Sequence, residues 1–385
     1  MKITYILHNQ IIDGSLISWM NLVQPLVGNN HEVVVICPKA LSANQEFQLF
    51  VDANNIKVYN CSLYIGPFGL PEKASFKQKM KWCKKYIAVI KHKFVSLKQI
   101  YKVLKQERPS IVHTNTGVIH EGFWASKLLN IPHVWHLREY QDKDWGFYIY
   151  PSKTIYSWLL SKSNIISITK DILKYFKLEE SNKAKVIYNG ICSAKDKTAI
   201  LDKENYFISA CTLAPNKGIQ DAIFAFMEFY KTHNEYKFYI LGNDQNEYAE
   251  ELKSHVQKKG LSDVIIFKGY QNKEQVYQYM QKAKALIVAS YNEGFGRMTA
   301  EAAFNGTLVI GRNTAGTKEI IDITGGFLFD GDYATIKEQM NAVHYLSKEE
   351  YYHLAQKAQD FAVEQYSIES NIEQIKQFYN NIINF

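Results

Sequence analysis

The sequence predicts an α/β protein built from two Rossmann-like domains, each with a doubly wound parallel sheet, that face a cleft. The chain has 385 residues, of which 46% are hydrophobic and 22% charged, which is ordinary for a globular protein large enough for two domains. Short β-rich runs alternate with helical patterns in two successive series. Because these runs are apolar throughout rather than alternating, each sheet should be covered by helices on both faces.

The first series contains six strand patterns bounded by turn residues or helical patterns. They are the runs 2–7, 32–36, 110–114, 133–137, 164–168 and 185–190. The last run ends at an Asn-Gly pair, which is a strong stop signal. We therefore expect a first domain over residues 1–192, followed by a polar linker over residues 193–204.

The second series contains five strand patterns, with helical patterns such as 218–230 and 247–259 between them. They are the runs 206–210, 236–241, 264–269, 285–290 and 307–311. We expect a second domain over residues 205–366, then a terminal helix over 367–385 without a sheet partner of its own. Ligands of such sheets bind at the carboxyl ends of the strands, so the cleft between the domains is the expected site.

Cysteine usage and hydropathy predict a cytoplasmic protein. The five cysteines are scattered and form no CxxC pair, which argues against a zinc site or a disulfide framework and for a reducing compartment. No apolar run reaches the ~18 residues of a membrane-spanning helix. The N-terminus MKITYILHNQ turns polar after one short strand-like run, so we expect no signal peptide.

The stretch 290–311, SYNEGFGRMTAEAAFNGTLVIG, carries the clearest chemical signal. A strand ends in a loop that contains Gly294, Phe295 and Gly296, and a helix begins near Arg297. Glycines let the backbone approach a ligand closely, and a helix N-terminus offers N–H groups and a positive dipole end. This arrangement suits a phosphate group.

Two carboxylates, Glu293 and Glu301, flank this turn. If the chain were helical throughout, they would lie roughly 12 Å apart. Glycosidase acid and base groups lie closer, at about 5–9.5 Å. The spacing instead suits two ends of an extended ligand with a diphosphate between them, as in a sugar nucleotide.

This stretch resembles the E-x7-E signature of retaining glycosyltransferases of family 4, which have the two-domain GT-B fold. The resemblance implies a nucleotide-diphosphate sugar as donor. It implies that Glu293 contacts the donor sugar and that Glu301 contacts the ribose. It also implies that the terminal helix crosses back to the first domain.

Two further segments of the second domain are similar to family motifs. SACTLAPNKG (209–218) resembles the segment whose lysine neutralises the donor diphosphate. Lys217 takes that role, Thr212 stands where the family usually has arginine, and Arg297 is the candidate for the second charge.

The segment 264–280 resembles the family segment that packs against the nucleotide base. Phe267, Gly269 and Tyr270 would frame that pocket. The alternative, that these are core aromatics at a strand end, stays open.

In the first domain, Asp13-Gly14-Ser15 follows the first strand and takes the place of the family's glycine-rich loop near the donor phosphates. Gly14 stands alone there, so the fingerprint GxGxxG of nicotinamide-binding proteins is absent.

Two strand ends of the first domain, SIVHTNTG (110–117) and PHVWHLREY (132–140), match family strands that end in polar residues. They make His113 and Asn115 acceptor-side candidates and His136 and Arg138 catalytic candidates. A strand histidine can equally be a hydrogen-bonded core residue, whereas a buried arginine needs an anionic partner.

We expect no metal and no cofactor other than the sugar nucleotide itself. The chain spells D-x-D at 142–144 and at 330–332, a pattern that binds a divalent metal in another glycosyltransferase fold. Such short patterns arise often by chance, and the GT-B resemblance implies metal-free catalysis.

The segment Lys73–Arg108 contains twelve lysines and arginines and one acid, so it carries +11, while the whole chain carries +7 and the remainder −4. From Trp82 onward its apolar spacing fits an amphipathic helix. Two interpretations stay open. The segment is a solvated helix packed on the sheet by its apolar face, or it is attracted to an anionic membrane leaflet at ~1 kcal/mol per surface cation. We expect no nucleic-acid partner, because no nucleic-acid module is recognisable.

Together these features predict a metal-independent retaining hexosyltransferase. It would move a sugar to a glycan or polyprenyl-linked acceptor in bacterial surface polysaccharide synthesis, in the cytoplasm or on the inner face of the plasma membrane. Lys217 and the amides of Gly294–Gly296 would stabilise the departing diphosphate. Two alternatives remain: a sugar-nucleotide epimerase of GT-B architecture, and a non-catalytic partner subunit, which Thr212 and Asn115 favour.

Overall fold

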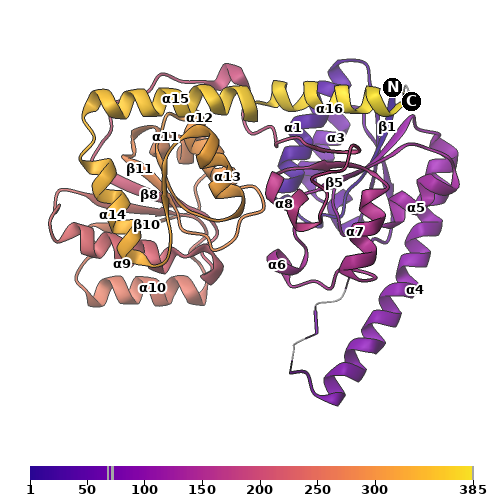
Figure 1. Ribbon diagram of the computed structural model, residues 1–385, viewed down its shortest axis with the longest axis horizontal. Coiled ribbons are helices and arrows are strands. Elements are labelled where there is room, and N and C mark those ends of the chain that lie inside the picture. The colour runs from indigo at the N-terminus through magenta and orange to yellow at the C-terminus, as the bar shows by residue number, and fades with distance from the viewer. Residues whose placement is uncertain (67–68, 71–72, 384–385) are drawn as a thin grey trace. The chain divides into compact units, whose positions relative to one another are not determined.

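The computed structural model describes residues 1–66, 69–70 and 73–383, and of Trp145 only the backbone. The chain forms two compact units, which are coloured by residue number in Figure 1. Unit 1 comprises residues 1–190 and 368–385, and unit 2 comprises residues 191–367. The last two residues of the expected terminal helix, 384–385, lie outside the described residues.

Unit 1 contains a seven-stranded sheet in the order β3-β2-β1-β4-β5-β6-β7, and all neighbouring strands are parallel. Its strands are β1 (Lys2–Ile6), β2 (Glu32–Cys37), β3 (Lys57–Asn60), β4 (Ile111–Thr114), β5 (His133–Leu137), β6 (Asn164–Ser167) and β7 (Ala184–Val186). The strand order reverses between β1 and β4. In open parallel sheets, ligands bind where the order reverses, at the carboxyl ends of the strands.

Helices cover this sheet, and the last of them comes from the end of the chain. They are α1 (Gly14–Gly28), α2 (Lys39–Ser42), α3 (Gln45–Ala53), α4 (Phe76–Glu107), α5 (Glu121–Leu128), α6 (Asp142–Trp145), α7 (Lys153–Ser161), α8 (Lys170–Tyr175) and α16 (Ile368–Ile383). Ile375 and Tyr379 of α16 join a core cluster with Tyr5 and Trp19. Helix α16 is therefore part of the first unit's core.

Helix α4 buries side chains only in its C-terminal half, from Lys93 onward, whereas Trp82 and Tyr86 make ring contacts with Tyr148 without being buried. Ile100 and Leu104 are fully buried in a core cluster, whereas Ile87 and Phe94 are exposed. At its C-terminal end, Glu107 forms ion pairs with Lys2 at 2.6 Å and Lys57 at 2.5 Å. The interpretation of a helix packed by its apolar face therefore holds for the C-terminal half of α4, while part of the apolar face is left exposed.

Unit 2 contains a six-stranded parallel sheet in the order β10-β9-β8-β11-β12-β13, which reverses between β8 and β11. Its strands are β8 (Tyr206–Ala210), β9 (Lys237–Leu241), β10 (Ile265–Gly269), β11 (Ala285–Val288), β12 (Val309–Arg312) and β13 (Phe327–Phe329). The residues expected to form a linker, 193–204, belong to this unit and begin with a short 3-10 turn, η1 (Ala194–Asp196).

The helices of unit 2 pack on both faces of its sheet, around an aromatic-rich core. They are α9 (Ile219–Tyr230), α10 (Glu247–Lys258), α11 (Lys273–Lys282), α12 (Arg297–Phe304), α13 (Ala315–Thr324), α14 (Tyr333–His344) and α15 (Lys348–Tyr366). In the described part of the chain, no helix combines the length and the apolar character that a membrane crossing requires.

The strand patterns predicted from the sequence all overlap strands, and the two-sheet architecture is confirmed. Two strands escaped prediction, β3 and β13, and both lie at sheet edges. Strand β3 begins and ends with a polar residue, and β13 is apolar but only three residues long. Neither therefore forms the longer apolar run, of about 4–8 residues, that marks a central strand.

Candidate functional site

The reversal point of the second sheet brings together the loops that follow β8 and β11. Lys217, at the end of a 3-10 turn η2 (Pro215–Lys217), places its Nζ 2.6 Å from Oε1 of Glu293. Gly218 has φ +63°, and a Cβ there would lie 2.2 Å from the carbonyl oxygen of Ala289. Only glycine fits that close approach, so the two loops pack backbone against backbone and hold the ion pair.

Two helix N-termini open side by side at Gly296. This glycine precedes α12 with φ +86°, and no side chain of the described residues caps that helix. The cap residue of α13, Thr314, makes no side-chain capping bond either. A Cβ on Gly296 would lie only 3.2 Å from the backbone nitrogen of Thr317 in the first turn of α13. Two positive dipole ends therefore meet at one point, which favours an anion.

Three buried side-chain atoms around this point have no hydrogen-bond partner in the described part of the chain. They are Nη1 of Arg297, Oγ1 of Thr299 and Oγ1 of Thr317. Buried polar atoms in native proteins are nearly always paired, because an unpaired one costs about 1–3 kcal/mol. Three of them beside two helix ends without side-chain caps indicate a site that an oxygen-rich ligand completes.

Glu301 lies inside α12 and is paired with Arg297. The two side chains are four residues apart, Nε of Arg297 lies 2.7 Å from Oε1 of Glu301, and Glu301 is 5% exposed. Because the helix begins only at Arg297, Glu293 stays in the preceding loop. The estimate of 12 Å assumed one continuous helix between the two carboxylates and does not apply.

The three residues expected at the nucleotide base lie around the end of β10 but in different surroundings. Phe267 packs against the core of unit 2, in keeping with the core-aromatic alternative. Gly269 has φ +66°, and its carbonyl accepts a hydrogen bond from the N–H of Gly242 at 2.9 Å. Tyr270 is 79% exposed, so its ring is open to contact.

At the carboxyl ends of the first sheet, buried polar residues form one hydrogen-bonded chain. The hydroxyl of Tyr5 lies 3.0 Å from that of Tyr379 in α16, which in turn bonds Nδ1 of His113. Nε2 of His113 lies 3.1 Å from Nδ1 of His136, and Nη2 of Arg138 lies 3.3 Å from that same Nδ1. His113 is fully buried with both ring nitrogens engaged, so it positions His136.

The donors in this chain fix the tautomer of His136. A guanidinium can only donate, so Nδ1 of His136 accepts from Arg138 and its proton lies on Nε2. Burial lowers the pKa of His136 and of His113 well below the ordinary value, so both rings are neutral. Nε2–H of His136 has no partner within the described residues and is a free hydrogen-bond donor.

Arg138 is a buried cation that contacts only neutral groups. Its Nε donates to Oδ1 of Asn115 at 2.9 Å, and its Nη1 donates to Oδ1 of Asn189 at 2.7 Å. Burial lowers its pKa to about 10, which leaves it charged at neutral pH. The residues that the structure describes provide it with no ion pair, so an anionic ligand group would stabilise it.

Glu139 follows Arg138 and is also buried. Its Oε1 accepts hydrogen bonds from Oγ1 of Thr116 and from the N–H of Gly117, both at 2.7 Å. Burial raises the pKa of this carboxyl to about 7. Through its hydrogen bonds to Thr116 and Gly117, the Glu139 side chain holds the loop after β4, next to Asn115.

Gly14 begins α1, directly after the cap residue Asp13, whose side chain accepts from the N–H groups of Ser15 and Leu16. A Cβ at Gly14 would meet no atom within 4 Å. Packing within the described chain does not require a glycine here, and the space in front of the helix N-terminus is open.

The aspartates of the two D-x-D patterns have structural partners. Asp142 accepts from the hydroxyl of Tyr175 at 2.6 Å, and Asp332 caps α14 by accepting from the N–H of Ala334 at 3.0 Å. Across residues 1–66, 69–70 and 73–383, no three His, Cys, Asp or Glu side chains are grouped as a metal site would require.

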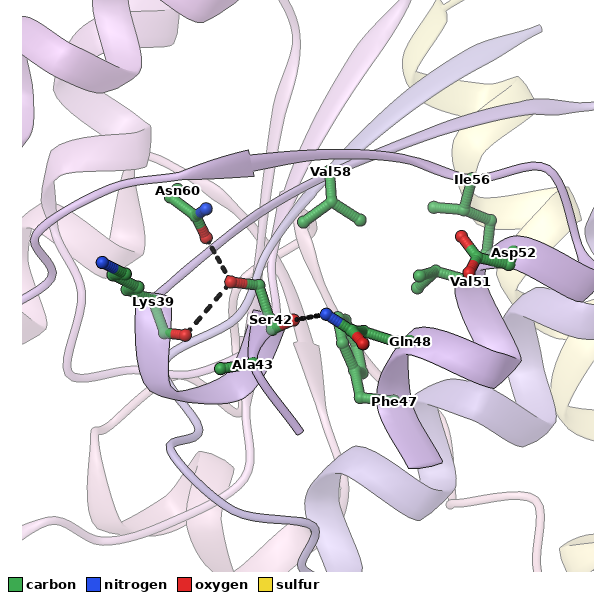
Figure 2. A pocket seen from close by; sticks show the side chains of 10 residues that line it. All are labelled: Lys39, Ser42, Ala43, Phe47, Gln48, Val51, Asp52, Ile56, Val58 and Asn60. Carbon is green, nitrogen blue, oxygen red and sulfur yellow. Dashed lines mark hydrogen bonds between the residues drawn. The ribbon is translucent and has the colours of Figure 1, made fainter. Parts of the chain in front are cut away.

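A surface pocket of about 600 Å³ lies away from these residues, between α2, α3 and the edge strand β3 (Figure 2). Its polar groups bond one another: Oγ of Ser42 donates to Oδ1 of Asn60 at 2.6 Å, and Nε2 of Gln48 donates to the carbonyl of Ser42 at 2.9 Å. With these groups already satisfied, the pocket has less to offer a ligand than the two strand-end sites.

Some residues of these sites were not anticipated from the sequence. They include Thr299 and Thr317 at the paired helix ends, and Asn189 and Tyr379 in the first unit. The sequence contained one signal for Thr317. The run Thr314-Ala-Gly-Thr317 follows a strand just as the loop 294–296 does, which could have indicated a second helix N-terminus at the site. Nothing in the local pattern marked Asn189 or Tyr379, since their partners lie far away in the sequence.

Comparison with known proteins gives two family matches that follow each other along the chain. Residues 12–195 match the model of Glycosyltransferase Family 4, and residues 193–366 match that of Glycosyl transferases group 1. The alpha-monoglucosyldiacylglycerol synthase of Streptococcus pneumoniae is 27% identical over 60% of this chain, and the match spans 58% of that relative. The enzyme of the same name from Acholeplasma laidlawii is 25% identical over 76% of this chain and 75% of its own length.

Solved structures show the same fold. The Anabaena protein HepE, crystallised with UDP, has a TM-score of 0.77 at 17% identity, and the superposition covers 99% of this chain and 100% of that one. The same protein has also been solved with UDP-glucose. The expected GT-B architecture is thereby confirmed.

Proposed function

Since the chain belongs to glycosyltransferase family 4, we propose that it is a retaining glycosyltransferase that uses a nucleotide-diphosphate sugar. The observation that carries this proposal is the pair of helix N-termini at Gly296 that have no side-chain cap. Three unpartnered polar atoms surround that point, and the ammonium of Lys217 lies on the neighbouring loop. That combination suits a diphosphate better than any neutral ligand.

Donor binding would exchange ion pairs. In the structure the cations Lys217 and Arg297 are held by Glu293 and Glu301. A diphosphate seated on the two helix ends would attract both cations and release both carboxylates. Glu293 would then accept hydrogen bonds from hydroxyls of the donor sugar, and Glu301 from the ribose.

The reaction would then run on one face of the sugar. The bond between the anomeric carbon and the phosphate oxygen breaks, and its electrons stay on the diphosphate, which Lys217, Arg297 and the helix ends stabilise. The acceptor hydroxyl attacks the oxocarbenium-like carbon from the same face, and its proton passes to the departing phosphate oxygen. The anomeric configuration is retained, and these cations take the place of a metal ion.

The first unit would supply the acceptor side. Nε2–H of His136 can donate to an oxygen but cannot accept a proton, so we assign it a binding role rather than that of a base. Arg138, buried among neutral partners, suits an anionic group. The names of the relatives, which refer to a glycolipid, support a lipid-linked acceptor.

We also propose where the enzyme works. A glycan or polyprenyl-linked acceptor of bacterial surface polysaccharide synthesis would be glycosylated on the inner face of the plasma membrane. The segment Lys73–Arg108, with its charge of +11, would draw a cytoplasmic enzyme to that anionic surface.

The test is a panel of UDP-, GDP- and ADP-sugars with the purified protein, with release of nucleoside diphosphate as readout. We expect one sugar nucleotide to be consumed, and UDP-glucose is the first to try because a structural neighbour was crystallised with it. With an acceptor present, NMR of the glycoside formed should show the donor's anomeric configuration. An inverted product would contradict the retaining mechanism.

The same panel separates the alternatives. An epimerase would convert a sugar nucleotide into its isomer without any acceptor, and neither free nucleotide nor glycoside would form. A non-catalytic subunit would consume no donor, and Glu293→Ala would leave glycan production in cells intact.

A further inference from the structure

The outer part of α4 carries an apolar stripe that no part of the described chain covers. The stripe consists of Phe76, Met80, Ile87 and Phe94, which are 80%, 47%, 54% and 68% exposed. At 100° per residue these four positions fall within about 40° of one another around the helix. Figure 1 shows this part of α4 extending beyond the sheet and the other helices of unit 1.

The stripe leads into an apolar groove of about 420 Å³ between α4, α5 and α7. Phe94 lines the groove, together with Trp124 of α5 and Ile155 and Trp158 of α7. The last three side chains are 45%, 52% and 61% exposed. Stripe and groove thus form one continuous apolar face, far larger than the isolated apolar residues normal on a soluble surface.

The exposed charges on these three helices are all positive. Helix α4 contains ten lysines, and α5 and α7 add Lys127 and Lys153. The three helices contain only two acids, and both are buried in ion pairs: Glu107 with Lys2 and Lys57, and Glu121 with Lys93 at 3.3 Å. No acid on these helices is left to balance the exposed lysines.

We propose that this face docks into the interface of an anionic lipid bilayer, with the stripe and groove taking up hydrocarbon and the lysines meeting lipid phosphates. The positive charge of the three helices favours an anionic bilayer over a second copy of the chain as the partner of this face. Pairing two α4 stripes would bring lysine-rich helices together, which like charges oppose. An anionic interface instead satisfies both features, since lysine stems lie along apolar surface and tryptophans favour the headgroup level.

This inference rests on the proposed attraction of the basic segment to anionic membranes and adds hydrophobic insertion through α4, α5 and α7. The distinction is measurable, because electrostatic attraction alone weakens with salt whereas buried apolar area does not. It can be tested without donor or acceptor, so its outcome is independent of catalysis.

The experiment is co-sedimentation of the full chain with vesicles of phosphatidylglycerol and phosphatidylcholine, or of phosphatidylcholine alone. The test variant is Ile87→Gln with Phe94→Gln, which leaves every charge in place. The matched control is Leu49→Gln with Tyr345→Gln, two side chains that are 64% and 74% exposed and lie off this face. We expect binding to anionic vesicles at moderate salt to fall at least tenfold in the test variant only.

Two further readouts complete the test. Brominated lipids should quench tryptophan fluorescence, and the quenching should be lost in Trp124→Phe with Trp158→Phe. Unchanged circular dichroism would show that the variants fold. Equal binding of test and control variants would overturn insertion while leaving charge attraction intact. Self-association that the test variant abolishes, without vesicle binding, would identify a second copy as the occupant and overturn the proposal.

Discussion

The two sheets end in sites that handle charge in opposite ways. In unit 2 each cation already has a carboxylate: Lys217 pairs with Glu293, and Arg297 with Glu301. In unit 1, Arg138 is more deeply buried, yet it bonds only to amides and an imidazole. A paired cation must exchange partners when a ligand arrives, whereas an unpaired one is ready for it. The first arrangement suits a ligand that must also leave, such as a diphosphate.

The largest effect should follow loss of the donor-side cation. In Lys217→Ala we expect kcat to fall by about 10²–10³, because one charge-assisted contact to the departing diphosphate is worth that much in the transition state. Turnover of the sugar nucleotide under saturating donor measures it. The matched control, Lys231→Ala, removes an exposed lysine paired with Glu228 and should retain full activity. Equal activity of both variants would remove Lys217 from the mechanism.

Arg138 should rank next. Arg138→Gln keeps a hydrogen-bonding amide but removes the charge, and we expect kcat/KM for the acceptor to fall about 100-fold, since a buried charged hydrogen bond contributes ~1.5–3 kcal/mol. Donor hydrolysis without acceptor should change little. Arg138→Lys keeps the charge and should recover part of the loss. If donor hydrolysis fell as much as transfer, Arg138 would act on the donor, and the contrast between the two sites would be wrong.

Glu139 gives the first unit a pH-dependent stability. Its pKa is about 7 in the fold, against 4.5 as its ordinary value. Between these values the folded state holds a proton that the unfolded state has released. Stability should therefore fall as pH rises from about 4.5 to 7, by up to about 3 kcal/mol. Urea unfolding at several pH values measures this slope. Glu139→Gln should flatten it, and an unchanged slope would assign it to another group.

The proposed exchange of ion pairs predicts that removing the charge of Glu293 strengthens nucleotide binding, and that this effect is smaller than the losses expected for Lys217 and Arg138. In Glu293→Gln, Lys217 loses the carboxylate that competes with the diphosphate. We expect UDP to bind several-fold more tightly, as a surface ion pair of ~1 kcal/mol is no longer broken, while sugar transfer falls. Calorimetric titration with UDP provides the measurement. Weaker UDP binding would mean that Glu293 itself supports the nucleotide and does not compete with it.

The sequence indicated the fold well because central parallel strands are buried on both faces. Their apolar runs are visible at once, as in 206–210 and 285–290. The edge strand β3 begins and ends with a polar residue, and the edge strand β13 is only three residues long, so neither forms a comparable run. In α4, the apolar spacing predicted a helix but not whether its apolar face is buried. A face packed on the sheet and an exposed face have the same apolar periodicity.

The candidate sites divide in the same way. The pairing of Lys217 with Glu293 follows from topology, because the two residues lie in the loops that follow β8 and β11, the strands between which the order reverses. The contacts of Arg138 with Asn189 and of His113 with Tyr379 join positions 51 and 266 residues apart. No local pattern encodes such pairs. They depend on how the whole sheet and α16 pack.

The glycines of the two loops test whether each loop is shaped for itself or for a ligand, and Gly14 should give the smallest effect on stability. Gly296→Ala places a Cβ at φ +86°, which costs about 1–2 kcal/mol of strain and should lower stability. Gly14 has no such constraint, and its Cβ would meet nothing within 4 Å. Gly14→Ala should therefore leave the melting temperature unchanged or slightly higher.

Activity then decides what Gly14 is for. If Gly14→Ala folds as well as the wild type yet raises KM for the donor, the open space before α1 is occupied by ligand, because the fold itself gives no reason to exclude a methyl group. Gly14→Ser, with its larger side chain, should raise KM further. Wild-type kinetics in both variants would place the donor entirely outside this loop and leave Arg138 and His136 as the ligand-facing groups of unit 1.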